Sequence, residues 1–118
     1  MKNPEHVIAF DASAVTPQHT VIDDPSVVDT PYKSCSWHHF ENAGKGAMAG
    51  IWEAEPHKER CKCDFDEMCH ILEGDVRLTD RHGQTRTFGA GDSFVVAAGF
   101  DGTWENLTAV RKVFFILS

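Results

Sequence analysis

The residues best suited to chemistry lie close together between Cys61 and Gly74, where the sequence reads CKCDFDEMCHILEG. This stretch holds three thiols, one imidazole and a group of carboxylates. Thiolate, imidazole and carboxylate groups bind transition metals, and carboxylates also act as general acids and bases. We therefore expect any chemical site in this protein to be centred on this stretch.

Short strands are expected to position the stretch. From Ser36 onward, segments rich in β-branched and aromatic residues alternate with turn signals about every 8–12 residues, which is typical of all-β domains. The expected strands span residues 47–53, 60–65, 68–72, 75–79, 85–88, 93–97, 103–107 and 110–117. Because no long segment has a helical pattern that could cross between parallel strands, we predict an antiparallel sandwich or barrel.

The two ends of the chain differ in character. Residues 1–35 contain several prolines and are expected to be largely irregular, since proline disfavours long helices and central strands. Within them, residues 6–10 could pair as an edge strand. This N-terminal arm would lie over the single domain formed by residues 36–118 or over a partner subunit; alternatively, it is a frayed tail. Residues 110–117 end in an apolar run on both faces, which indicates a central strand or a homodimer interface.

The composition excludes several classes of partner. The chain has 118 residues, enough for one domain with its own core, and a formal net charge of -7 with a pI of about 5.4. An acidic chain lacks the clustered Lys and Arg that nucleic acids and anionic membrane surfaces require. The sequence shows no signal peptide pattern and no apolar run long enough to span a bilayer. We therefore expect a cytoplasmic protein whose four cysteines are reduced.

The spacing of two motifs resembles that of the cupin superfamily. The first cupin motif places an H-x-H pair ahead of a glutamate and a glycine, and here Glu67 and Gly74 fit those last two positions. The H-x-H position holds Cys61 and Cys63. In the second motif, Gly102 stands where cupins have a histidine. The other positions of the second motif are occupied by Gly91, Ala97, Gly99 and Asn106.

Four segments carry a closer resemblance: residues 50–53, 66–74, 91–105 and 111–115. They are similar to a small single-domain branch that includes the cupin domain of (S)-ureidoglycine aminohydrolase and the ethanolamine-utilisation cupins. The resemblance covers residues 47–117. It implies a conical jelly roll, the double-stranded β-helix of RmlC-like cupins, with the site inside the barrel and often a homodimer.

The resemblance also implies a metal site with altered ligands. Cys61, Cys63 and Glu67 would occupy three ligand positions, and Gly102 leaves the last one without a side chain. Two thiolates and a carboxylate would suit Cu(I) or a divalent ion such as Zn, Mn or Fe, with His70 or water as the fourth ligand. The alternative is that no metal is bound and that the cysteines are small core residues.

Glu67 is the candidate catalytic residue. A carboxylate enclosed in an apolar barrel is suited to general acid or base catalysis, although it could instead accept hydrogen bonds and order the barrel mouth. The side chains expected to line a ligand pocket around it are Trp52, Phe65, Cys69, Phe94 and Trp104. We expect His57 at the barrel mouth, in the loop after the strand 47–53, and His70 pointing outward. Arg60, Arg77 and Lys112 are the cations expected near the barrel; we expect them on the solvated surface, although any of them could meet an anionic ligand.

Two classes of function follow from these expectations. An inward Glu67 beside thiols in an enclosed cup, together with the resemblance, favours an enzyme that acts on a small polar, nitrogen-containing metabolite. The altered metal positions favour a non-enzymatic small-molecule binding module, or a structural dimer with a degenerate site. The sequence leaves open whether the protein is an enzyme.

Overall fold

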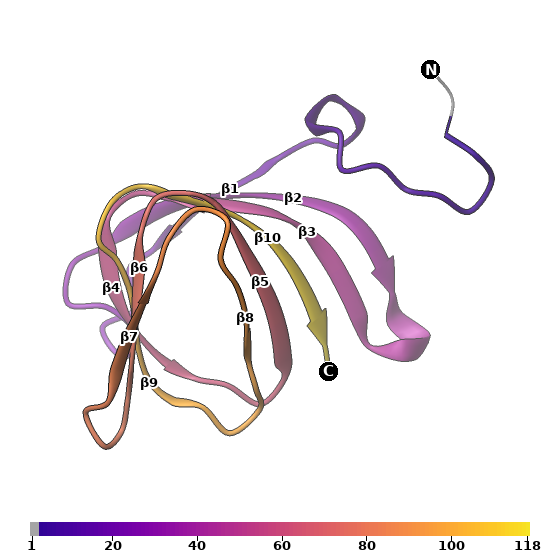
Figure 1. The fold of residues 1–118 in the computed structure, drawn as a ribbon. Helices are drawn as coiled ribbons and strands as arrows, with labels where there is room; N and C mark the ends of the chain where they lie inside the picture. Colours follow the sequence, from indigo (N-terminus) through magenta and orange to yellow (C-terminus); the bar gives the residue numbers. More distant parts are fainter. Residues whose placement is uncertain (1–2) are drawn as a thin grey trace.

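The regular secondary structure of the chain consists almost entirely of β-strands (Figure 1). The computed structural model describes residues 3–118. Their strands are β1 (Gln18–Ile22), β2 (Tyr32–Asn42), β3 (Ala47–Ala54), β4 (His57–Lys62), β5 (Asp66–Glu73), β6 (Val76–Asp80), β7 (Thr85–Phe88), β8 (Ser93–Val96), β9 (Asp101–Asn106) and β10 (Val110–Leu117). The helical segments of these residues are two single turns, η1 (Ala12–Ala14) and η2 (Ala43–Lys45). Neither turn has the length or apolar character that crossing a membrane requires.

The strands form two antiparallel sheets. The larger sheet has the order β1-β2-β3-β10-β5-β8, and the smaller sheet has the order β4-β9-β6-β7. The two sheets face each other as layers that curve round into a barrel, while β1 and the far ends of β2 and β3 extend beyond it (Figure 1). The predicted all-β, antiparallel architecture is confirmed.

Inward-facing residues of both sheets build the core. β10 lies between β3 and β5 in the middle of the larger sheet, so the prediction of a central strand at 110–117 is confirmed. Its buried face carries Val110, Lys112 and Phe114. Ile71 of β5 and Val76 of β6 are fully buried in the same interior. Side chains two residues apart on β10 therefore point into the space between the sheets.

The N-terminal part is more ordered than its prolines indicate. β1 and the beginning of β2 lie inside the segment that was expected to be irregular, and they pair along their full shared length. The prolines of this region lie outside the two strands, so no ladder hydrogen bond is lost to them. The edge strand expected at residues 6–10 is not formed. Residues 1–2 of the predicted arm lie outside the described part of the chain.

Residues 24–29 are bound to β4 through side-chain contacts of Arg60. This strand begins at His57, earlier than the expected start at residue 60. The Arg60 guanidinium donates to the Ser26 carbonyl oxygen at 3.0 Å and forms an ion pair with Asp29 at 3.0 Å. These contacts bring the chain to Tyr32, the first residue of β2, beside the inner face of β4. A residue from the predicted arm thus enters the barrel.

Candidate functional site

A cavity of about 290 Å³ opens between the two sheets. Its polar wall includes Tyr32, Glu59, Cys61, Cys63, Glu67 and Lys112. Its aromatic wall includes Trp52, Phe65, Phe100, Trp104 and Phe114. The cavity thus combines apolar surface with a few convergent polar groups, which is typical of small-molecule sites.

A buried ion pair lies at the centre of the site. The Lys112 Nζ atom lies 2.8 Å from Glu67 Oε2, and only 7% of the Lys112 residue is exposed. The same ammonium stands over the ring of Trp104, 4.2 Å from its centroid, and 4.7 Å from that of Trp52. Burial disfavours the charged form, but the Glu67 carboxylate, which accepts a hydrogen bond from the ammonium, and the nearby Glu59 outweigh it and raise the pKa of Lys112. Lys112 therefore remains an ammonium ion at neutral pH.

The expectation that Lys112 lies on the solvated surface is wrong. Lys112 lies on the inward face of β10, which also carries the buried residues Val110 and Phe114. Strict alternation through 110, 112 and 114 would have placed it inside the barrel. We expected Lys112 on the surface because buried lysines are rare. Its burial is possible because Glu67, which lies on another strand, forms an ion pair with it.

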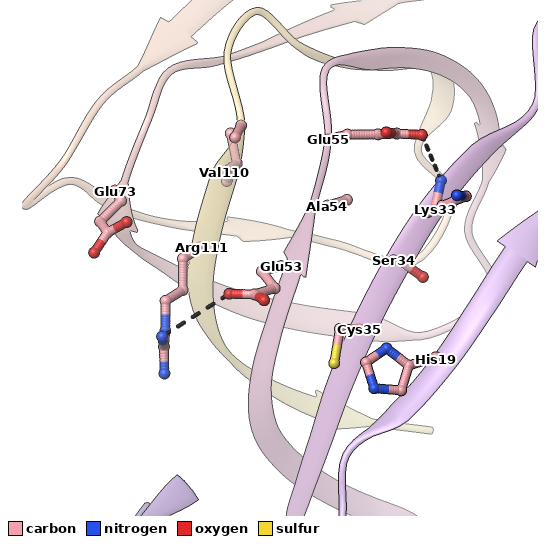
Figure 2. Close-up of a pocket in the computed structure, with 11 residues that line it drawn as sticks. His19, Lys33, Ser34, Cys35, Glu53, Ala54, Glu55, Glu73, Val110 and Arg111 are labelled. Carbon is pink, nitrogen blue, oxygen red and sulfur yellow. Dashed lines mark hydrogen bonds and ion pairs between the residues drawn. The ribbon is translucent and has the colours of Figure 1, made fainter.

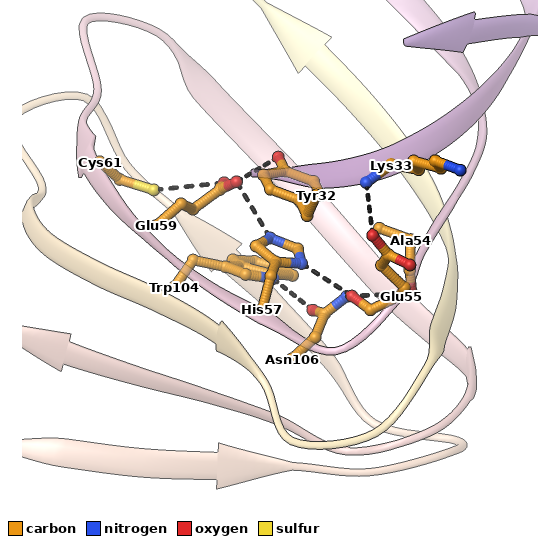
Figure 3. Close-up of polar contacts among 9 residues, drawn as sticks. All are labelled: Tyr32, Lys33, Ala54, Glu55, His57, Glu59, Cys61, Trp104 and Asn106. Carbon is orange, nitrogen blue, oxygen red and sulfur yellow. Dashed lines mark hydrogen bonds and ion pairs between the residues drawn. The ribbon is translucent and has the colours of Figure 1, made fainter. Parts of the chain in front are cut away.

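A second polar group occupies the opposite side of the site, at the beginning of β4 (Figure 3). The Tyr32 hydroxyl donates to Glu59 Oε2, and His57 Nε2 lies 3.0 Å from the same oxygen. His57 Nδ1 lies 2.8 Å from the Glu55 carbonyl oxygen, and the Tyr32 ring stacks on the imidazole with 3.4 Å between centroids. Both ring nitrogens of His57 thus lie within hydrogen-bonding distance of an oxygen atom, one from the Glu55 backbone and one from the Glu59 carboxylate.

Glu59 is ionised despite its burial. Burial alone would raise its pKa, but the hydrogen bonds from His57 and Tyr32 outweigh that effect and hold the pKa of Glu59 below its ordinary value. Conversely, burial and the hydrogen bond to Glu59 raise the pKa of Tyr32, so its hydroxyl keeps its proton. The group therefore consists of one carboxylate held by the Tyr32 hydroxyl and the His57 imidazole.

Tyr32 and Glu59 were not anticipated as site residues, and His57 was expected in a loop. Inward and outward residues alternate along β4, which places His57, Glu59 and Cys61 on one face. Extending the predicted strand to residue 57 would have found both Glu59 and His57. No local signal identifies Tyr32, because it reaches the barrel only through the long-range pairing of β2.

Asn106 joins the two sheets beneath this group. Trp104 Nε1 donates to Asn106 Oδ1 at 2.7 Å, and Asn106 Nδ2 donates to the carbonyl oxygens of Ala54 and Glu55 at 3.3 Å each. Asn106 is buried, and all three of these hydrogen bonds join it to other residues of the protein. The residue that fills the last position of the second motif therefore orients Trp104 and fixes the turn ahead of His57.

The predicted ligand-lining residues separate into two sets. Trp52, Phe65 and Trp104 lie on the cavity wall as expected. Cys69 is fully buried behind the ion pair, with its sulfur 3.4 Å from Glu67 Oε2. Phe94 stacks on Phe88, with 4.0 Å between ring centroids, and packs in the core. Cys69 and Phe94 thus lie next to the cavity but do not line it.

The thiols at the predicted metal positions are held in their protonated form. Cys61 and Cys63 lie on the cavity wall. Burial first and nearby carboxylates second, chiefly Glu59 for Cys61 and Glu67 for Cys63, raise the pKa of both thiols. A metal ion bound at these positions would therefore have to displace a proton from each thiol.

The position of the missing histidine is closed by the backbone. A Cβ atom at Gly102 would lie 1.9 Å from the carbonyl oxygen of Thr79, so no larger residue fits there without moving a strand. His70, the suggested alternative, points away from the cavity, with Nδ1 2.7 Å from Ser93 Oγ. Among residues 3–118, no three His, Cys, Asp or Glu side chains are grouped so that they could hold a metal ion. The donor set therefore does not fit a cupin metal centre.

A second hollow, of about 420 Å³, lies at the ends of β2, β3 and β10 (Figure 2). Two of its charged groups form an ion pair, Arg111 and Glu53 at 3.9 Å, and Glu55 accepts a hydrogen bond from the Lys33 backbone N–H at 2.8 Å. None of the predicted catalytic, ligand-lining or metal-binding residues lies on its wall. The cavity inside the barrel is the better candidate site.

The family model described as the EutQ-like cupin domain matches residues 41–114. The chain belongs to the EutQ-like cupin domain family. The predicted cupin jelly roll is thereby confirmed. The chain has no significant match among curated proteins.

Solved structures of cupins resemble this family member. A protein of unknown function in the DUF861 family from Pseudomonas syringae is 26% identical, with a TM-score of 0.76; the match covers 86% of this chain and 43% of that one. This chain thus spans less than half of the Pseudomonas protein. A DUF861 family protein from Thermotoga maritima is 34% identical over 54% of this chain and 73% of its own, with a TM-score of 0.52. The putative ethanolamine utilization protein Q from Salmonella typhimurium shares the fold at 18% identity, with a TM-score of 0.65 over 87% of this chain and 96% of its own.

Proposed function

We propose that this cupin binds a small polar, nitrogen-containing molecule in the cavity between its sheets and transforms it by acid–base chemistry. The observation that carries the proposal is the pair of carboxylates on the cavity wall: Glu67 lies beside the buried Lys112 ammonium, and Glu59 lies beside the buried His57 imidazole. Perturbed titratable groups gathered in one cavity are a physical mark of functional sites.

The carboxylates retain acceptor capacity for a ligand. Within the described residues, the protein engages only Oε2 of Glu67. The other Glu59 oxygen, Oε1, receives only the Cys61 thiol at 3.7 Å, and a thiol is a weak donor. A molecule that presents N–H groups can therefore donate to both carboxylates while its apolar part lies against Trp52 and Trp104.

Glu67 is the best-placed general base. Its Oε2 atom lies 2.8 Å from Lys112 Nζ, while its other oxygen remains available to accept a proton from a bound molecule. Once Glu67 is protonated, the Lys112 ammonium lies next to a neutral acid and is free to stabilise negative charge that develops on the substrate. The site thus contains a proton acceptor and a fixed positive charge within hydrogen-bonding distance of each other.

The decisive test is turnover by a Glu67→Gln variant. Small amines, amides and amino acids would first be screened for an increase in melting temperature and for chemical change by NMR. We expect Glu67→Gln to lower turnover of any substrate so found by about 10²–10⁴-fold, the usual contribution of a general base. Glu73→Gln, on the exposed end of the same strand, is the matched control and should retain activity. Unchanged turnover in Glu67→Gln would refute the catalytic role.

One observation favours a binding module as the second candidate. The charges of Lys112 and Glu67 already neutralise each other within the protein, as in a purely structural ion pair. A compound that raises the melting temperature and is recovered chemically unaltered would support this candidate.

We also propose that the protein acts as a homodimer in a reducing compartment such as the cytoplasm. In support, all four cysteines are unpaired. Phe115 and Leu117, on the outer face of the central strand, are 40% and 49% exposed, which leaves an apolar surface for a second copy.

A further inference from the structure

The Lys112 ammonium places a positive charge on the wall of the barrel cavity. We propose that the Lys112 ammonium takes the place of the metal that the cupin signature predicts, and that it is the fixed positive charge that an oxygen atom of a bound ligand meets. The metal part of this proposal stands on the cavity residues alone, whereas the ligand part rests on the proposed function.

The ammonium is held rigidly. Its nitrogen lies 2.8 Å from Glu67 Oε2 and is flanked by the faces of Trp52 and Trp104. Trp104 is in turn fixed by its hydrogen bond to the buried Asn106. Cation–π contacts and a charged hydrogen bond both favour a cation at this point of the cavity.

A metal ion bound by the predicted ligands would compete directly with this ammonium. Glu67 is the one predicted ligand that keeps the cupin residue type, and its Oε2 atom is already engaged by Lys112. An ion held by Glu67, Cys61 and Cys63 would lie beside a second positive charge in a poorly hydrated cavity, where like charges repel strongly. The ammonium and the metal are therefore alternatives at this carboxylate.

The ammonium also has donor capacity for a ligand. It carries three N–H groups; one is given to Glu67 and another faces the Cys69 sulfur at 3.7 Å, a weak acceptor. The remaining donor is available in the cavity, whose wall includes Lys112. A carboxylate or carbonyl oxygen is the chemical group that matches it.

The first test uses Co²⁺ as a probe, because thiolate-bound Co²⁺ gives visible and charge-transfer absorption bands. The wild-type protein should show no such bands after addition of one equivalent of Co²⁺. Lys112→Met removes the charge but keeps the length of the side chain, so it releases Glu67 from its ion pair and lets the carboxylate turn toward Cys61 and Cys63. This variant should develop the bands, and Lys112→Met combined with Cys61→Ala should lose them again. Lys58→Met, at an exposed position of β4, is the matched control and should behave as wild type.

The second test uses formate, the smallest carboxylate, and monitors the indole N–H signals of Trp52 and Trp104 by NMR. We expect saturable shifts in the wild type and at least a tenfold weaker response in Lys112→Met. Lys58→Met should again match the wild type. Neither test depends on turnover, so failure of the Glu67 experiment would leave both results interpretable.

Three outcomes would overturn the proposal. One is Co²⁺–thiolate absorption in the wild type that disappears in Cys61→Ala, since the metal would then coexist with the ammonium. Another is the absence of bands in a folded Lys112→Met protein, and the third is an equal formate response in wild type and variant. If Lys112→Met does not fold, Lys112→Gln serves as the uncharged variant, and circular dichroism verifies the fold of each protein.

Discussion

At the scale of single residues, burial keeps the thiols of this cupin in their protonated form. Burial is the leading cause in each case, and carboxylates nearby add to it, so the pKa of every cysteine is raised; that of Cys69 reaches about 12. Since the thiolate is the reactive species, these cysteines are poor nucleophiles.

We predict that the native protein resists alkylation. At pH 7.5, iodoacetamide should modify all four cysteines at least about tenfold more slowly than in the urea-unfolded chain, where each thiol returns to a pKa near 8.5. Mass spectrometry of timed samples measures the rates. A native cysteine that reacts as fast as in the unfolded chain would show that its thiol is not protected in this way.

Glu59 should make stability depend on acidic pH. Its folded-state pKa is lowered by His57 and Tyr32 against the effect of burial, so the unfolded chain binds the proton more tightly. The resulting stabilisation is fully present above the ordinary glutamate pKa of about 4.3 and is lost as the pH falls through the lower folded value. Urea unfolding between pH 7 and 3 should show this loss.

Tyr32→Phe tests the same group at neutral pH. Without the hydroxyl, Glu59 loses a buried donor, and we expect a loss of about 1–3 kcal/mol in the free energy of unfolding at pH 7. The decrease in stability between pH 5 and 3 should become shallower, because the pKa of Glu59 moves back toward its ordinary value. A variant with the wild-type stability and pH dependence would contradict the assigned hydrogen bond.

At the scale of strands, local pattern predicted the elements but not their partners. The alternation from residue 47 onward gave most strands and the inward direction of Glu67, Trp52 and Trp104, because side-chain direction on a strand is a local property. The neighbours of Lys112 depend on β10 lying between β3 and β5, and Tyr32 reaches Glu59 across 27 residues of sequence. Such long-range pairing decides which charges meet, and single-sequence periodicity does not encode it.

Gly102 shows how closely two strands can approach. Because a Cβ atom at Gly102 would meet the Thr79 carbonyl at 1.9 Å, Gly102→Ala must push β9 away from β6. We expect a loss of about 1–3 kcal/mol in the free energy of unfolding, as for other overpacked positions. Gly44→Ala is the control, since its added methyl would meet only a side-chain oxygen at 3.5 Å. Equal stability of both variants in urea titrations would contradict the close contact.

At the scale of the whole molecule, the outer face of the larger sheet is unusually apolar. Met68, Val95, Phe115 and Leu117 are each at least 39% exposed on β5, β8 and β10. Phe115 and its strand neighbour Met68 lie side by side, and Phe40 of β2 stacks near Phe115 with 6.4 Å between ring centroids. A continuous apolar surface of this kind favours association with a second copy.

We predict that the protein in solution has twice the mass of the 13.1 kDa chain. Phe115→Glu should convert the dimer into a monomer, because it places a charge in the centre of the apolar face. Leu107→Glu, an exposed apolar residue after the end of β9, should leave the dimer intact. Light scattering distinguishes these outcomes, and a monomeric wild type would refute the dimer.

The position of Tyr32 also decides how much of the chain an expression fragment must contain. The family match begins at residue 41, so an expression fragment cut to that match would lack β1, most of β2 and the Tyr32 ring. Such a fragment would leave the His57 face uncovered and Glu59 with one donor fewer, even though every matched residue were present. The part of the chain that matches the family model is therefore shorter than the part that assembles the site.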